Sequence, residues 1–143
     1  MRKAISLFLF SLVLFLSLSS CSDGRVKIED YEWKMRCVMH QEDNRIVYDA
    51  AEEMSSVYPG AKAVELTLVA SNGKITVTDK TNDKTYVGTY TVSSKNPRGT
   101  EYKIVIDGNS GNAGAAMTTY ANGDEEPTLP ISIGGYSIYF YAK

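Results

Sequence analysis

Apolar and polar residues alternate one by one along most of the chain from residue 63 onward. Runs with this period of two are separated by short turn signals such as Asn72-Gly73 and Gly134-Gly135. Because side chains of a strand point alternately to opposite faces, each run predicts a strand with one buried face. Asn-Gly and Gly-Gly pairs accept the positive φ angles of two-residue hairpins. The pattern therefore predicts an antiparallel meander.

One further strand is predicted before this meander. Trp33, Met35, Cys37 and Met39 share one parity, while Val38 takes the other. This period of two predicts a strand that begins near residue 31. Trp33, Met35, Cys37 and Met39 are expected to point toward a core.

A second short strand and a helix are expected between this strand and the meander. Residues 45–48 predict the strand. Apolar residues then recur at helical spacing over residues 50–57, and Pro59-Gly60 ends the run. Asp49 and Glu52 have the spacing of a capping box, which favours one short helix here.

Together these patterns predict about eight or nine strands with hardly any helix. Eight antiparallel strands commonly close into an up-and-down barrel, because closure removes unpaired sheet edges. A two-sheet β-sandwich is the alternative. The positions expected to face inward are mostly bulky: Trp33, Met35, Leu66, Leu68, Tyr86, Tyr90, Tyr102, Ile104, Ile131, Ile138 and Phe140. Since side chains can just fill an eight-stranded barrel, a filled core is favoured over an open calyx.

The first twenty residues follow a different pattern. Arg2 and Lys3 precede an uncharged apolar run over residues 4–18, which is typical of a cleavable signal peptide. At about 1.5 Å per residue, this run is shorter than the ~30 Å hydrocarbon thickness of a bilayer. A permanent transmembrane helix is therefore disfavoured.

The end of this leader, Leu18-Ser19-Ser20-Cys21, resembles the bacterial lipobox. The resemblance implies cleavage between Ser20 and Cys21 and attachment of a diacylglycerol to the Cys21 thiol. It implies an exported protein, anchored by lipid in a bacterial cell envelope, with its domain outside the cytoplasm. Two or three acyl chains would anchor it stably. An ordinary secretory cleavage beside a buried cysteine is the alternative.

These features divide the chain into a signal peptide (residues 1–20), a lipidated cysteine with a polar tether (21–30) and one barrel domain (31–143). Removal of the leader leaves 123 residues, which suffice for one core. Thirteen basic and seventeen acidic residues then give a formal charge of −4, which argues against a nucleic-acid partner. With Cys21 bound to lipid, Cys37 has no partner for a disulfide.

The layout resembles the small lipocalin-like lipoproteins of bacteria. A lone tryptophan stands on the first strand in Tyr31-Glu32-Trp33, and a short helix and a leucine-rich strand follow. The Asn72-Gly73 turn and the Gly88-Thr89-Tyr90 strand add to the likeness. The resemblance implies a barrel whose interior or mouth binds a small apolar molecule. The residues expected to line that ligand site or to fill the core are Trp33, Tyr86, Tyr90, Tyr102 and Phe140.

Few residues suit catalysis. His40, the single histidine, is followed by Gln41-Glu42-Asp43 and is expected to be an exposed loop residue. Cys37 is expected to be a buried, unreactive thiol because its parity matches that of Trp33. Asp107-Gly108-Asn109-Ser110-Gly111 lacks the closing Glu of a calcium loop and predicts a hairpin turn. The sequence predicts no enzyme, no metal site and no cofactor.

Two classes of function remain open. The first is a non-enzymatic binding or interaction module whose partner is a small apolar molecule or a protein. Outward tyrosines such as Tyr139 and Tyr141 suit a protein interface, although cross-strand packing is the favoured explanation for them. The second is an anchored inhibitor of an exogenous hydrolase such as lysozyme. Asn109-Ser110-Gly111-Asn112-Ala113 is similar to the Ser-Gly-rich loop motif of the small lysozyme-inhibitor lipoproteins.

Overall fold

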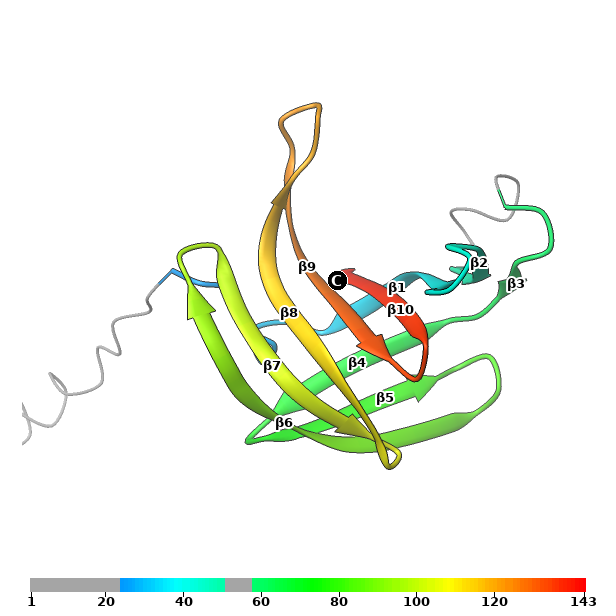
Figure 1. The fold of residues 1–143 in the computed structure, drawn as a ribbon, viewed down its shortest axis with the longest axis horizontal. Helices are drawn as coiled ribbons and strands as arrows, with labels where there is room; N and C mark the ends of the chain where they lie inside the picture. Colours follow the sequence, from blue (N-terminus) through cyan, green and yellow to red (C-terminus); the bar gives the residue numbers. More distant parts are fainter. Residues whose placement is uncertain (1–23, 51–57) are drawn as a thin grey trace, which may run out of the picture.

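The computed structural model describes residues 24–50 and 58–143, most of which lie in ten β-strands (Figure 1). These strands are β1 Trp33–His40, β2 Ile46–Asp49, β3 Lys62–Ala63, β4 Leu66–Ser71, β5 Lys74–Asp79, β6 Lys84–Asn96, β7 Gly99–Ile106, β8 Asn109–Thr119, β9 Glu125–Ile133 and β10 Tyr136–Ala142. No membrane-spanning helix occurs in these two segments. The helix expected over residues 50–57 lies almost wholly outside the described residues.

Eight of the strands form a closed antiparallel barrel. The ring runs β1-β4-β5-β6-β7-β8-β9-β10, and β10 pairs with β1 from Trp33↔Ala142 to His40↔Tyr136. From β4 onward, each strand pairs with the next one in the chain. The predicted meander closing into a barrel is confirmed, and the two-sheet sandwich is not the fold.

Two-residue hairpins join several strands, as the turn signals predict. Asn72 and Gly73 have φ angles of 51° and 76°, and Asp107 and Gly108 have 48° and 78°. Two consecutive positive φ angles are the signature of the type I′ turn, which matches the twist of the flanking strands. The segment that begins at Asp107 is therefore a hairpin turn.

A bulge in β1 changes which residues face the core. The register with β10 shifts between Met35 and Cys37. Met35 is 1% exposed, and Val38 rather than Cys37 is the next deeply buried residue, at 6%. One extra residue sends all later side chains to the opposite face. The expectation that Cys37 and Met39 point inward is therefore wrong.

β1 also changes its neighbour along its length. Trp33 and Lys34 pair with β4, whereas Cys37, Val38 and Met39 pair with β2. β2 in turn pairs in parallel with the two-residue β3. The wall between β1 and β4 is therefore joined directly only near the beginning of β1, and β2 diverges from β4 beyond that point (Figure 1).

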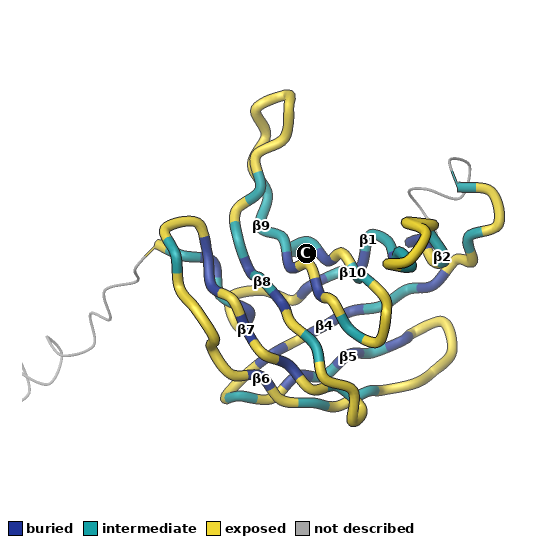
Figure 2. Tube along the Cα trace, viewed as in Figure 1, coloured by how far each residue is buried: buried dark blue, intermediate teal, exposed yellow. Residues whose placement is uncertain are grey.

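The buried side chains form one cluster inside the barrel, and buried and exposed positions alternate along the strands (Figure 2). Val26 and Ile28 belong to this cluster with exposures of 6% and 0%. The segment 24–32 therefore closes one end of the barrel, which we name the closed end. Part of the segment that was expected to be a tether thus packs in the core.

Candidate functional site

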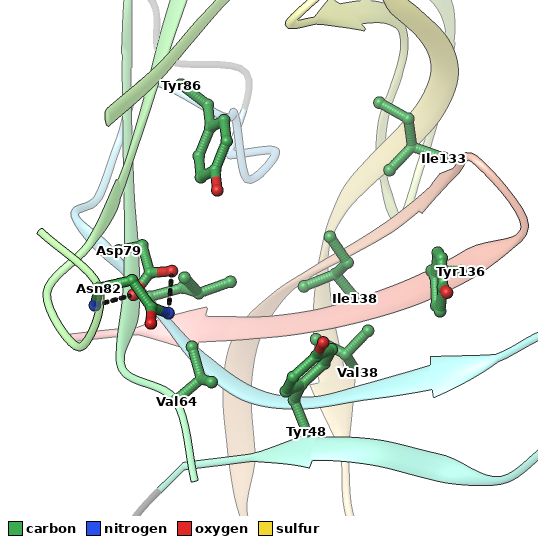
Figure 3. Close-up of a pocket in the computed structure, with 10 residues that line it drawn as sticks. Val38, Tyr48, Val64, Asp79, Asn82, Tyr86, Ile133, Tyr136 and Ile138 are labelled. Carbon is green, nitrogen blue, oxygen red and sulfur yellow. Dashed lines mark hydrogen bonds between the residues drawn. The ribbon is translucent and has the colours of Figure 1, made fainter. Parts of the chain in front are cut away.

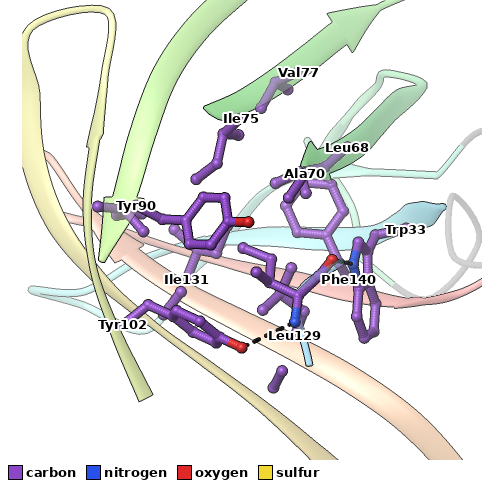
Figure 4. Packing of buried hydrophobic residues seen from close by; sticks show 14 of the residues in the cluster. Trp33, Leu68, Ala70, Ile75, Val77, Tyr90, Tyr102, Leu129, Ile131 and Phe140 are labelled. Carbon is purple, nitrogen blue, oxygen red and sulfur yellow. Dashed lines mark hydrogen bonds between the residues drawn. The ribbon is translucent and has the colours of Figure 1, made fainter. Parts of the chain in front are cut away.

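The closed end is densely packed around the segment before β1 (Figure 4). The Ile28 N–H donates a hydrogen bond to Tyr102 Oη at 3.1 Å, and the Ile28 carbonyl accepts one from Trp33 Nε1 at 2.8 Å. Tyr90 Oη donates to the Glu29 carboxylate at 2.5 Å. Burial raises the pKa of both Tyr90 and Tyr102, and the bond to Glu29 raises that of Tyr90 further. These side chains fill the interior of the barrel at this end.

The opposite end, at the turns after β5, β7 and β9, is hollow. Two adjoining cavities of about 370 and 360 Å³ open there, and both are lined by Leu66, Tyr86, Ile133, Tyr136 and Ile138. Ligand pockets in proteins typically measure about 300–1,000 Å³. We name this joined space the cup. The expectation of a filled barrel is therefore correct at the closed end and wrong at the cup.

The cup exists because the barrel wall divides on one side. Where β1 exchanges β4 for β2, Tyr48 of β2 and Val64 of the β3–β4 link line the opening. Opposite them, Ile133 and Ile138 project inward from β9 and β10. Figure 3 shows these side chains and Tyr86 around a common space. The lining is thus mainly apolar and includes three tyrosines, Tyr48, Tyr86 and Tyr136.

One carboxylate is buried in the wall of the cup. Asp79 takes the inward position that follows Ile75 and Val77 on β5, and it is 5% exposed. Its Oδ1 accepts a hydrogen bond from the Asn82 N–H at 2.9 Å, and its Oδ2 accepts one from Asn82 Nδ2 at 2.8 Å. Within the described segments, Asp79 has no salt bridge. The Asp79 carboxylate in the wall of the cup therefore accepts hydrogen bonds from the neutral Asn82 and has no positively charged partner among the described residues.

The five core or ligand residues predicted from the sequence divide between the two ends. Tyr86 and Phe140 line the cup. Trp33, Tyr90 and Tyr102 pack at the closed end and are at most 7% exposed. The predicted lipidation and cleavage residues, Cys21 and Ser20, lie outside the described residues.

Sequence reasoning missed the polar residues of the cup. They are Tyr48, Asp79, Asn82, Asp107, Asn109 and Tyr136. Only Asp79 left a signal, because it continues the inward alternation of β5 by one step. The others come from turns and strand ends, where polar residues are ordinary and carry no periodic pattern.

Cys37 and His40 lie outside the cup. Cys37 is half-buried, and burial raises the pKa of its thiol, with a further rise from the nearby Asp49 carboxylate and an opposing effect of Arg36. His40 is the last residue of β1, and its Nδ1 lies 3.1 Å from Asp43 Oδ1. It is therefore not the loop residue that was expected. No cluster of three or more metal-ligating side chains occurs in the described residues.

The outward tyrosines of β10 do not form a free aromatic row. Tyr139 is 38% exposed, but the Arg36 guanidinium covers Tyr141 at 4.6 Å from the ring centroid. Arg36 also donates to Tyr120 Oη at 2.8 Å and to Glu126 Oε2 at 3.1 Å. Tyr141 thus takes part in cross-strand packing, the explanation favoured for these tyrosines.

The segment similar to the inhibitor loop motif belongs to a strand. Asn109 pairs with Ile106 and Ala113 with Tyr102, so residues 109–113 extend along β7 from the hairpin turn. A protruding Ser-Gly loop is therefore not formed there. Comparisons of the chain with protein-family models, with curated proteins and with solved structures find no match.

Proposed function

We propose that this chain is a lipid-anchored, extracytoplasmic binding protein without enzymatic activity, and that its cup holds a small, mainly apolar molecule. The cup itself supports this proposal. Buried side chains fill the barrel interior at the closed end, while the open end of the same barrel exposes Leu66, Ile133 and Ile138 to a hollow of ligand size. Unfilled space forgoes dispersion contacts that a structural barrel would make. A ligand would supply those contacts.

The position of the chain start suits this role. Gly24 lies at the closed end, beside Pro97, Arg98 and Thr119. Only two residues separate Gly24 from Cys21. A lipid on Cys21 would therefore hold the closed end near the membrane and leave the cup open on the far side.

Replacement of Cys21 by serine is expected to abolish incorporation of labelled palmitate into the full chain. The reason is that a thioether to diacylglycerol requires the thiol. Cys37→Ser is the matched control, since Cys37 is the second of the two cysteines in the chain, and it should keep the label. Metabolic labelling in a lipoprotein-processing bacterium measures both. A label retained by Cys21→Ser, or lost by Cys37→Ser, would contradict the proposed anchor.

The cup is tested by filling it from within. Ile133→Trp places a large side chain in the cup, whereas Ser132→Trp adds the same group at the neighbouring exposed position of β9. Residues 22–143 contain all described strands and the closed end, so this fragment is used. We expect Nile red, a neutral dye, to bind wild type and Ser132→Trp alike and Ile133→Trp at least about tenfold more weakly, a loss of ~1.4 kcal/mol.

Far-UV circular dichroism establishes that both tryptophan variants remain folded. Equal dye affinity in all three proteins would place the dye outside the cup. Absence of saturable binding to wild type would remove the support for an apolar ligand.

A further inference from the structure

We infer that the molecule held in the cup carries a protonated amino group on an otherwise apolar body. This inference rests on the proposed function, because it names the chemical class of the ligand. It follows from the charged side chains that line the cup and from the hydrogen bonds that the Asp79 carboxylate accepts.

The charged side chains among the described residues that line the cup are all acidic. Asp79 lies in the wall and Asp107 lies at the rim, in the turn after β7. The lining includes no lysine, arginine or histidine from residues 24–50 or 58–143. A concave site with apolar walls and one sign of charge concentrates the field and attracts the opposite charge. The cup should therefore favour a cation.

The hydrogen bonds of Asp79 leave room for a ligand group. Each of its oxygens accepts one bond from Asn82, and a carboxylate can accept about four. Burial of a carboxylate is costly unless a positive charge compensates it. Asn82 contributes dipoles but no charge. An ammonium group in the cup would supply both the missing charge and further donors.

The apolar neighbours of Asp79 indicate that the rest of the ligand is a hydrocarbon body. Leu66 lies directly across the strand pair from Asp79, and Val64 and Ile138 line the same cavity. A hydrocarbon body would contact these residues while the head group met the carboxylate. A fatty acid of the same length would bring a second negative charge near Asp79, and like charges in such a site are unfavourable.

The test compares decylamine, decanol and decanoate, three molecules with the same chain and different heads. Each displaces Nile red from residues 22–143 at pH 7, below its aggregation concentration. We expect decylamine to bind at least about tenfold more tightly than decanol, and decanoate to bind most weakly. Asp79→Asn should reduce the preference for decylamine over decanol to less than threefold.

Two further variants keep the test decisive if Asp79→Asn disturbs the turn that contains Asn82. Asp107→Asn retains the fold, since asparagine suits the positive φ of 48° in a type I′ turn, and it should lower the preference for the amine. Asp83→Asn is the control: this residue has a similar φ of 52°, is exposed and does not line the cup. It should bind like wild type.

The outcomes separate the two levels of the proposal. If decanol binds in the cup and decylamine binds no better, the amine inference is overturned while the binding function stands. The same conclusion follows if decanoate binds best, or if Asp79→Asn and Asp107→Asn both keep the full preference. If neither Nile red nor any of the three molecules binds, the binding function itself fails.

Discussion

Gly88→Ala is expected to lower the free energy of unfolding by about 3 kcal/mol or more, the upper range for overpacking. Gly88 lies on β6, where it pairs with Ile75 on one side and Ile106 on the other. A Cβ atom there would overlap the backbone carbonyl oxygen of Val105 and would lie 2.9 Å from Ile106 Cα. Backbone atoms cannot rotate away as a flexible side chain can. The barrel wall would have to move.

Gly114→Ala is the matched control for Gly88→Ala. Gly114 also lies within a barrel strand, β8, but a Cβ atom there would meet nothing within 4 Å, and its φ is not positive. Alanine at such a site stabilises proteins by about 0.4–1 kcal/mol, because it restricts the unfolded chain. The two variants should therefore shift the urea midpoint in opposite directions. Equal shifts would show that the Val105 carbonyl of β7 does not approach Gly88 of β6 closely enough to exclude a Cβ atom.

A chain that begins at Tyr31 is expected to be largely unfolded, whereas one that begins at Gly24 should be as stable as residues 22–143. The shorter chain loses burial of Val26 and Ile28, which contributes about 1.5–3 kcal/mol for each side chain. It also leaves Trp33 Nε1 buried without the Ile28 carbonyl that accepts its hydrogen bond. An unsatisfied buried donor costs ~1–3 kcal/mol. The total approaches the ~5–15 kcal/mol stability of an ordinary domain.

Trp33 reports on this loss directly, since it is the only tryptophan and is fully buried. Its emission should shift to the red in the chain that begins at Tyr31 and should stay unchanged in the chain that begins at Gly24. Ile28→Ala in residues 22–143 should cost about 2–5 kcal/mol by removing one buried side chain. A chain from Tyr31 with a native emission maximum and an unchanged urea midpoint would contradict the role given to the closed-end segment.

The barrel could be predicted from the sequence because its strands carry local signals. Ile75 and Val77 alternate with threonines, and Asn72-Gly73 has the φ angles that its turn demands. Pairing of neighbouring hairpins then follows from chain order, since each strand from β4 to β10 pairs with the next. Closure of the barrel through β1 and β10 could be predicted because a closed barrel has no unpaired sheet edges.

The cup could not be predicted because its causes are not local. The bulge between Met35 and Cys37 leaves no mark in the alternation of residue types, and it reverses the parity of Val38. The exchange of β4 for β2 along β1 depends on pairing between distant segments. Asp79 carried no prediction from the sequence, because a carboxylate at an inward position is unusual in a core. Functional sites are where such departures from pattern are expected.

Native mass spectrometry tests the cup most directly, applied to residues 22–143 that their own host exports behind a cleavable signal peptide and that are purified without detergent. We expect a discrete adduct that is lost on denaturation and absent from Ile133→Trp. If the bound molecule is an amine, it should be released from the protein as a positively charged species. A bare polypeptide mass that stays bare after incubation with decylamine and decanol would contradict the claim that the cup binds an apolar molecule.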